Sequence, residues 1–260
     1  MTDTYANLLV EISDDVLWVR INRPRRRNAL SGATLVELGR VCAEQATRQS
    51  LKAAVLTGAG TEAFAAGGDL KELSTIRSAE KIGAFFDMAS EALDQVRRFP
   101  VPVVAALNGW ALGGGAELAL ACDYRVAVPD ASIGYVQAKL NICCGFGGGA
   151  DFMRVLGSST GMMLAMSGQI LDARSALAAG LIDAVAADGE PLESCIARFL
   201  QPITQRPAQV LRAYKAMAIA QRFGPGWSQL REQEREWFVR TWTHPDHWAV
   251  ADALAGNKTA

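Results

Sequence analysis

Two glycine-rich segments each lead from an apolar run into the predicted start of a helix. The first is Phe64–Leu73, FAAGGDLKEL, in which Gly67 and Gly68 precede Asp69. The second is Asn108–Leu118, NGWALGGGAEL, in which three glycines precede an apolar helix. Each places unpaired backbone N–H groups at a helix N-terminus, where the helix dipole favours negative charge. Two such N–H groups pointing at one oxygen would form an oxyanion hole, although the glycines can equally serve close packing.

Glu117 is the residue best suited to acid–base chemistry near these glycines. It lies three residues after Gly114, in the first turn of an otherwise apolar helix. Because burying an unpaired carboxylate is costly, a purely structural role explains this acid poorly. A carboxyl group in such surroundings has a perturbed pKa, as catalytic acids and bases do. We therefore predict that Glu117 faces a substrate.

Three further motifs could carry other chemistry, and their surroundings argue against each. Gly58–Ala63 resembles a dinucleotide-binding turn, but more glycines follow where a long crossover helix is required. Gly157–Gly161, GSSTG, matches the sequence pattern of a nucleophile elbow, but a helix rather than a strand is predicted before it. His244 and His247 have the wrong spacing for a helical metal pair. We therefore predict no dinucleotide, serine-nucleophile or metal site.

The charge balance is that of an ordinary globular protein. The 260 residues include 26 Lys plus Arg and 27 Asp plus Glu, so the net charge is −1. This balance gives no electrostatic reason to expect binding to nucleic acid or to an anionic membrane. The apolar segment Val101–Cys122 is long enough to cross a bilayer, but it contains Pro102, several glycines and Glu117. We predict a buried strand, turn and helix there, and no membrane span.

The cysteines and the N-terminus indicate a reducing, cytoplasmic location. The five cysteines are an odd number without a CxxC pair, which argues against a disulfide framework and against zinc. The N-terminal sequence MTDTYANLLVEISDD lacks the basic and apolar regions of a signal peptide.

Short apolar runs alternate with helical patterns along the chain. The runs predict strands buried on both faces of a sheet, at Val16–Ile21, Ala53–Thr57, Val103–Leu107, Tyr124–Val128 and Leu181–Val185. Helices are predicted over 34–42, where Thr34 and Glu37 have capping-box spacing, and over 82–96, 193–200, 209–222 and 227–254, the last with a break near residues 243–245. We therefore predict an α/β core over residues 1–200 and a helical C-terminal subdomain over residues 201–260.

Three motifs taken together resemble those of the crotonase, or enoyl-CoA hydratase/isomerase, superfamily. They are FAAGGDLKEL, NGWALGGGAELALACDYRVA and GFGGG at Gly145–Gly149. The runs INRP at 21–24 and NAL at 28–30 are similar to the family's first strand and following turn. The similarity extends from about residue 8 to about residue 255. It implies a crotonase-type α/β spiral of ββα units, with a C-terminal helical subdomain that assembles a homotrimer, or a hexamer made of two trimers.

The resemblance also implies which groups bind an acyl-CoA thioester. The thioester carbonyl would accept hydrogen bonds from the backbone N–H groups of Gly68 and Gly114, which would stabilise an enolate. Coenzyme A would enter as part of the substrate, with no permanently bound cofactor and no metal. A phosphate of coenzyme A could pair with Arg25 or Arg27, although a solvated turn explains these arginines equally well. The implied coenzyme A contacts are Arg25, Arg27, Ala29, Ala66, Gly68, Asp69, Leu70 and Lys71.

Hydratases of this family use two glutamates that hold and activate one water. Glu117 matches the first, whereas Gln137 occupies the position of the second. Glutamine can hydrogen-bond a water or a carbonyl, but it cannot accept a proton at neutral pH. The implied catalytic groups are therefore Glu117, Gln137, Gly68 and Gly114. In the next turn, Cys143 and Cys144 are most simply explained by small apolar packing.

Three functions are compatible with these residues. The first is hydratase or isomerase chemistry on an enoyl-CoA. The second is decarboxylation of a short branched malonyl-CoA, because loss of CO₂ forms the enolate without a base. The run GWALGGGAEL with ACDYR, and the tail Thr241–Pro245, resemble the ethylmalonyl-CoA/methylmalonyl-CoA decarboxylases. The third is a non-catalytic subunit that binds acyl-CoA.

Overall fold

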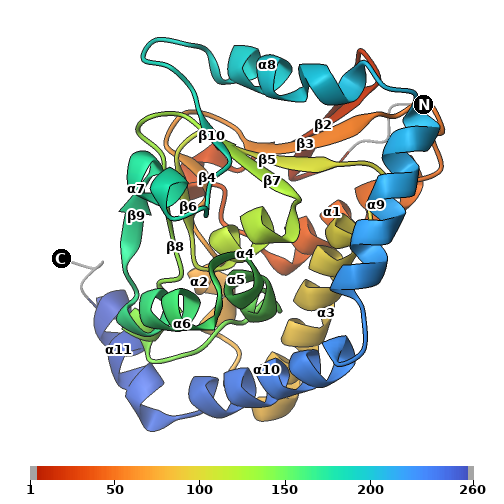
Figure 1. Cartoon of the computed structure of the whole chain (residues 1–260). Helices are drawn as coiled ribbons and strands as arrows, with labels where there is room; N and C mark the ends of the chain where they lie inside the picture. The colour runs from red at the N-terminus through yellow and green to blue at the C-terminus, as the bar shows by residue number, and fades with distance from the viewer. Residues whose placement is uncertain (1–4, 257–260) are drawn as a thin grey trace.

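Two β-sheets organise the core of the protein, for which the computed structural model describes residues 5–256 (Figure 1). The strands of the larger sheet are β1 (Leu8–Ser13), β2 (Val16–Ile21), β3 (Ala53–Gly58), β5 (Val103–Leu107), β7 (Tyr124–Ala127) and β10 (Ala184–Val185). The strands of the smaller sheet are β4 (Ala63–Ala65), β6 (Trp110–Leu112), β8 (Ser132–Gly134) and β9 (Ile170–Asp172). Both sheets keep this spatial order, and their strands are parallel except for the antiparallel pairs β1–β2 and β8–β9.

Helices surround both sheets. They are α1 (Gly32–Gln45), α2 (Leu70–Leu73), α3 (Ala79–Arg97), α4 (Gly114–Ala121), α5 (Gly149–Leu156), α6 (Ser158–Ser167), α7 (Ala173–Ala178), α8 (Leu192–Thr204), α9 (Ala208–Arg222), α10 (Trp227–Trp242) and α11 (Pro245–Gly256). Two short 3-10 turns are η1 (Pro24–Arg26) and η2 (Gln137–Leu140).

A repeated unit connects the two sheets. The chain passes from the larger sheet to the smaller one three times, as β3–β4, β5–β6 and β7–β8. The first of these pairs leads into α2 and α3, and the second leads into α4. This is the predicted ββα spiral. Because β6 pairs in parallel with both β4 and β8, the segments that leave these three strands lie side by side.

The central strands β2, β3, β5 and β7 of the larger sheet are largely buried on both faces, which explains why they read as continuous apolar runs, whereas the edge strand β1 is mostly exposed. On one face, Ile196 and Leu200 of α8 pack against Val55 and Val104. Figure 1 shows α8 above the sheet, with α1, α3 and α4 on the other side. The segment Val101–Cys122 forms β5, β6 and α4, and no helix within residues 5–256 is long and apolar enough to cross a membrane.

The C-terminal helices are anchored to the core by buried ion pairs. Arg222 of α9 lies 2.6 Å from Asp151, and Arg231 of α10 lies 2.8 Å from Asp94. The predicted break separates α10 from α11 at Thr243–His244. The boundary predicted after residue 200 falls inside α8, and the division into core and subdomain stays a prediction. Residues 257–260 of the predicted subdomain, and residues 1–4 of the N-terminal segment considered above, lie outside the described residues.

The capping of α1 differs from the prediction. Ser31 is the N-cap, and its side chain accepts a hydrogen bond from the Thr34 N–H. Glu37 does not close a capping box, because its carboxylate accepts hydrogen bonds from the backbone N–H groups of Ala6 and Asn7. The prediction placed the N-cap three residues too late, at Thr34 instead of Ser31.

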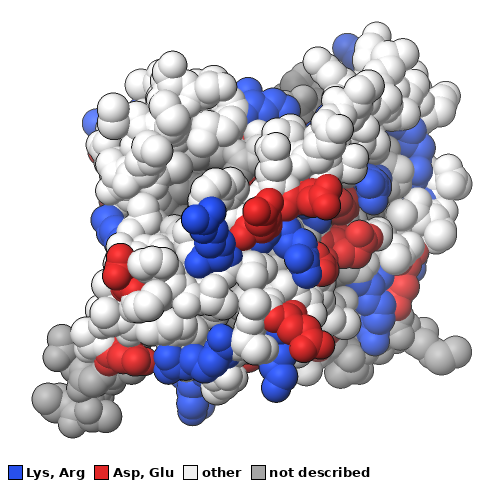
Figure 2. Space-filling view, turned by 90° about the horizontal axis from the view of Figure 1, so that it is seen from below, with Lys and Arg blue, Asp and Glu red and all other residues white. Residues whose placement is uncertain are grey.

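Acidic and basic side chains are interspersed on the face seen from below, which includes the α10 side of the molecule (Figure 2). This face therefore offers no extended basic surface to a polyanion.

Candidate active site

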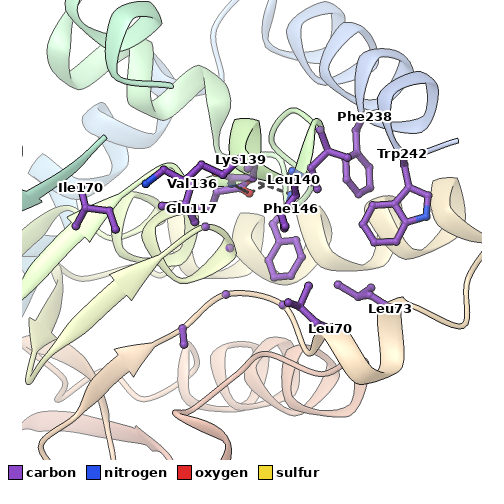
Figure 3. Close-up of a pocket in the computed structure, with 18 residues that line it drawn as sticks. Leu70, Leu73, Glu117, Val136, Lys139, Leu140, Phe146, Ile170, Phe238 and Trp242 are labelled. Carbon is purple, nitrogen blue, oxygen red and sulfur yellow. Dashed lines mark hydrogen bonds between the residues drawn. The ribbon is translucent and has the colours of Figure 1, made fainter. Parts of the chain in front are cut away.

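A cavity of about 360 Å³ lies where the segments leaving β4, β6 and β8 meet α10 (Figure 3). Both glycine-rich segments, Glu117 and Gln137 border it, so the structure brings together all four predicted catalytic groups. Phe238 and Trp242 of α10 line the side opposite Ile170 and Lys139 in Figure 3. The full lining is Ala66, Gly67, Gly68, Leu70, Leu73, Gly113, Gly114, Glu117, Val136, Gln137, Lys139, Leu140, Ile142, Gly145, Phe146, Ile170, Phe238 and Trp242.

The two glycine turns are neighbours because their strands pair. Gly67 (φ +103°) and Gly113 (φ +55°) adopt backbone conformations that side chains strongly disfavour. A Cβ atom added to Gly67 would lie 3.8 Å from the Gly114 nitrogen. At Gly115 an added Cβ would lie only 1.9 Å from the carbonyl oxygen of Ala65, so the start of α4 touches the end of β4. Glycine is thus required for this approach, and packing is part of its role.

The same turns leave two N–H groups available at the cavity. Leu30 donates to the Gly67 carbonyl (2.8 Å) and accepts from the Asp69 N–H (3.0 Å), so the Gly68 N–H takes no part in this pairing. Gly114 is the first residue of α4, where an N–H has no acceptor within the helix. Within residues 5–256, neither N–H has a hydrogen-bond acceptor. The assignment of these two groups as an oxyanion hole belongs to the proposal below.

The two segments predicted to contact coenzyme A also lie together. The Ala66 N–H donates to the Arg27 carbonyl at 3.0 Å. Arg27 itself is held by Glu62 (Nε–Oε1 2.5 Å) and lies over the Trp110 ring at 5.3 Å. The side chain of Arg25 is exposed. These positions fit a shared binding surface, and the coenzyme A contacts themselves stay a prediction.

Asp69 links the Arg23–Ala29 turn to the segment that contains Gly68. Its carboxylate caps α2 by accepting from the Lys71 N–H, and it pairs with Arg23 at 2.7 Å. Burial raises the pKa of Asp69, but the hydrogen bond and charge of Arg23 outweigh it, so the net pKa lies below the ordinary value. Arg23 also donates to the Ala29 carbonyl, which fixes the turn opposite Gly68.

Glu117 is buried, with 1% of its surface exposed, and its carboxylate is fully hydrogen-bonded. Oε1 accepts from Gln137 Nε2 (2.7 Å) and from the Gly145 N–H (3.2 Å). Oε2 accepts from the N–H groups of Phe146 (2.9 Å) and Gly148 (2.8 Å). Burial raises the pKa of Glu117, and although these four donors stabilise the charged form, the net pKa lies above the ordinary value.

Gln137 is the partner that orients Glu117 toward the cavity. A carboxylate can only accept, so the amide nitrogen of Gln137 faces Glu117 and its oxygen faces away. That oxygen, Oε1, is buried and has no hydrogen-bond partner. A buried acceptor of this kind costs free energy until a donor reaches it. A donor brought to this oxygen, such as a water or a substrate hydroxyl, would satisfy it.

Glu234 is the residue that sequence reasoning missed. It lies on α10, and one of its carboxylate oxygens lies within 4.8 Å of a Glu117 oxygen and of Cys144 Sγ. Glu234, Phe238 and Trp242 are spaced by four residues, so they share one face of α10. An acid on the same face as two buried aromatic residues is a signal that the sequence contained.

The ligand atoms around Glu234 are better suited to hydrogen bonding than to binding a metal ion. Among the described residues, Glu117, Cys144 and Glu234 are close enough to share an ion. The Glu117 carboxylate, however, already accepts four N–H groups, which is about its full capacity. Burial raises the pKa of Cys143 to about 12 and raises that of Cys144 well above its ordinary value, so both remain thiols rather than metal-binding thiolates.

Two of the motifs set aside above have roles in local structure. Helix α5 ends at Leu156, directly before Gly157–Gly161, so no strand precedes that segment. His247 Nδ1 contacts the Leu140 carbonyl at 2.7 Å, and His244 Nδ1 accepts from the Asp246 N–H. The two histidines thus serve local structure.

Comparison with known proteins places this geometry in a family. The enoyl-CoA hydratase/isomerase family profile matches residues 11–249. The short-chain-enoyl-CoA hydratase of Clostridium acetobutylicum is 36% identical over 186 residues, which cover 71% of this chain and 70% of that protein.

Solved structures agree with the profile. An enoyl-CoA hydratase from Bacillus anthracis superposes with a TM-score of 0.79 at 32% identity, over 90% of this chain and 92% of that one. An enoyl-CoA hydratase from Mycobacterium avium subsp. paratuberculosis K-10 gives a TM-score of 0.84 at 26% identity, over 95% and 98% of the two chains. With the ββα spiral and the paired glycine turns, these similarities show that the chain belongs to the enoyl-CoA hydratase/isomerase family.

Proposed function

We propose that the protein is a lyase that adds water to a short enoyl-CoA thioester. The observation that carries this proposal is the pairing of one buried carboxylate, Glu117, with the unpartnered amide oxygen of Gln137 at a cavity bordered by two free N–H groups. In this reaction the Gly68 and Gly114 N–H groups donate hydrogen bonds to the thioester oxygen and stabilise the enolate that forms there.

Gln137 positions the water, and Glu117 moves its proton. A water that donates one hydrogen to the Gln137 oxygen and the other to a Glu117 oxygen, in place of one of the four N–H donors, has a lone pair free for the β-carbon of the substrate. As the oxygen–carbon bond forms, the proton passes to Glu117 and the electron pair of the double bond moves to the thioester oxygen. The protonated Glu117 then returns the proton to the α-carbon. Water is added, and the carboxylate is regenerated.

The loop at 145–148 sets the geometry of this proton transfer. Its three N–H donors to Glu117 fix the carboxylate in one rotamer and favour its charged form, which is the form that acts as a base. Phe146 lies against both glycine turns, because a Cβ added to Gly68 or Gly114 would lie 3.3 or 2.6 Å from its ring. The loop thus connects the base to the place where the enolate oxygen would lie.

A second function, decarboxylation of a short branched malonyl-CoA, is favoured by one further observation. Lys139 lines the same cavity as Gln137 and offers a cation to a substrate carboxylate. With a neutral amide at position 137, no second acid at the cavity repels such a substrate. Loss of CO₂ would leave the electron pair as the enolate at the Gly68 and Gly114 N–H groups, and Glu117 or water would protonate the α-carbon.

The test is a substrate panel with the wild type and Glu117→Gln. The hydratase proposal predicts loss of the enoyl-thioester absorbance with crotonyl-CoA and no CO₂ from methylmalonyl-CoA or ethylmalonyl-CoA. CO₂ release without hydration selects the second function. Binding without turnover of any thioester selects a non-catalytic acyl-CoA-binding subunit and contradicts both reactions.

The assembly and location are also proposals. We infer a homotrimer, or a hexamer of two trimers, because α6 exposes Met162, Met163 and Met166 at 50%, 67% and 73%. Of the aromatic residues of α10, Phe238 and Trp242 are buried within the chain itself, whereas Trp237 is exposed. Five free cysteines fit the cytoplasm. Sedimentation at micromolar concentration tests the assembly, and a monomer there contradicts it.

A further inference from the structure

Helix α10 brings a second buried acid to the back of the active site. Glu234 does not line the cavity, but its carboxyl oxygen lies within 4.8 Å of Glu117. Its Oε1 accepts a hydrogen bond from the Gly149 N–H at 2.9 Å, next to the Gly148 N–H that binds Glu117. The two carboxyl groups are therefore held by adjacent residues of one turn.

Few groups around Glu234 can balance a negative charge. The titratable or charged groups that face it are Glu117 from α4, Tyr135 after β8, Cys143 and Cys144 from the loop before α5, Arg97 from α3 and Arg231 from α10 itself. The two arginines are the cations of this set, and both have nearer acids. Arg97 pairs with Asp94 (2.6 Å) and Asp151 (2.8 Å), and Arg231 pairs with Asp94 (2.8 Å).

The two carboxyl groups differ in how well their charged forms are stabilised. Glu117 accepts four N–H groups, whereas one N–H donor, from Gly149, binds Glu234. Two carboxylates this close in a buried site cannot both ionise easily at neutral pH. The first proton therefore leaves Glu117, and the pair retains its second proton on Glu234. Burial, followed by the charge of Glu117, raises the pKa of Glu234 to about 8.

We propose that Glu234 is a positioning residue for the reaction proposed above: it stays a neutral carboxylic acid beside Glu117, so that Glu117 carries the only carboxylate charge of the pair. This inference rests on the proposed function for its catalytic consequence, although the protonation state can be measured without any substrate. When Glu234 loses its proton, its negative charge raises the proton affinity of Glu117, which has to give its proton to the α-carbon. The same charge also repels the negative charge of the enolate. Turnover therefore falls as Glu234 ionises.

Infrared difference spectroscopy of the substrate-free enzyme tests the protonation state directly. The wild type is expected to show the carbonyl stretch of a buried, protonated carboxylic acid at pH 6.5, and to lose it as the pH rises through about 8. Glu234→Gln, which keeps an acceptor for the Gly149 N–H, loses this band. Glu236→Gln, on an exposed position of the same helix, retains it. A wild type without the band, or a band that survives Glu234→Gln, overturns the proposal.

A second variant keeps the inference testable if Glu234→Gln does not fold. In Glu117→Gln the neighbouring charge is removed, so the band of Glu234 is expected to titrate at a lower pH than in the wild type. An unchanged midpoint contradicts the coupling of the two acids.

The pH profile of kcat tests the catalytic consequence. We expect kcat of the wild type to fall by about tenfold per pH unit above pH 8, as for any single ionisation, and kcat of Glu234→Gln to stay level over that range. A merely structural role would lower kcat equally at all pH values. If neither enzyme turns over any thioester while the infrared band behaves as expected, the proposed function has failed and the protonation state stands.

Discussion

Glu117 supplies the carboxyl group among the residues that line the cavity. Replacing it by glutamine removes this group with almost no change in the shape of the side chain. General acid–base catalysis by one side chain contributes about 10²–10⁴-fold in rate. Because Gln137 cannot take over the proton, we expect Glu117→Gln to lower kcat for crotonyl-CoA by about that factor. Binding of the acyl-CoA should persist, because the glycine turns and the apolar walls are unchanged.

The loss of stability expected for Glu117→Gln follows from the hydrogen bonds that Glu117 accepts. Each carboxylate oxygen accepts two N–H groups, whereas an amide has a single acceptor oxygen. In Glu117→Gln, two buried N–H groups therefore face an NH₂ group. Each unsatisfied donor costs about 1–3 kcal/mol, or roughly 2–6 kcal/mol together, and removal of a buried charge offsets part of this. We expect Tm to fall by about 2–4 °C for each net kcal/mol.

The assay combines enoyl-thioester absorbance at saturating crotonyl-CoA with a thermal melt followed by circular dichroism. Glu11→Gln, on the exposed edge strand β1, is the matched control and should keep both kcat and Tm. Wild-type turnover by folded Glu117→Gln would refute the catalytic role. A variant that melts at the wild-type temperature would refute the account of its four hydrogen bonds.

Three further changes test other parts of the structure. Gln137→Ala should lower kcat for crotonyl-CoA, because the attacking water loses one of the two groups that hold it, whereas Gln137→Glu should raise crotonyl-CoA hydration because it restores a second titratable group; an equal rate in the wild type and Gln137→Glu argues against the role given to position 137. Trp242→Ala should increase kcat/KM for longer enoyl-CoAs relative to crotonyl-CoA, because this ring lines the apolar end of the cavity; an unchanged ratio places the acyl chain elsewhere. Asp151→Asn should lower the free energy of unfolding by about 3–5 kcal/mol, measured in urea, because it leaves buried Arg97 and Arg222 short of their anion. Burial raises the pKa of Asp151, but the arginine charges outweigh it and lower the net pKa. The contribution of the Asp151 carboxylate to the free energy of unfolding is therefore present at neutral pH and is lost as the pH falls below about 4. An Asp151→Asn variant whose stability depends on pH in the same way as that of the wild type contradicts this.

The central strands of the larger sheet could be predicted because both of their faces are buried, whereas the mostly exposed edge strand β1 was not predicted. Val16–Ile21 and Val103–Leu107 are strands over the whole predicted range. At Leu181–Val185 only the last two residues form a strand, because Leu181 and Ile182 are buried in a turn. The three-residue strands Ala63–Ala65 and Trp110–Leu112 are too short to produce a periodicity.

The candidate site also has a part that the sequence could predict and a part that it could not. Gly68, Gly114, Glu117 and Gln137 lie in or beside recognisable motifs, and they do border one cavity. Glu234 lies on a different helix late in the chain, and its approach to Glu117 depends on how α10 packs on the core. The spacing of Glu234, Phe238 and Trp242 marks one face of α10, but no local pattern encodes where that face packs, so only the structure reveals that Glu234 approaches Glu117.

A crystal structure with a bound acyl-CoA tests the central claim most directly. The account predicts that the thioester oxygen lies about 2.7–3.1 Å from the nitrogens of both Gly68 and Gly114, with the β-carbon next to a water held by Glu117 and the Gln137 oxygen. A thioester oxygen that contacts neither nitrogen, or an acyl group directed away from Glu117, would contradict it.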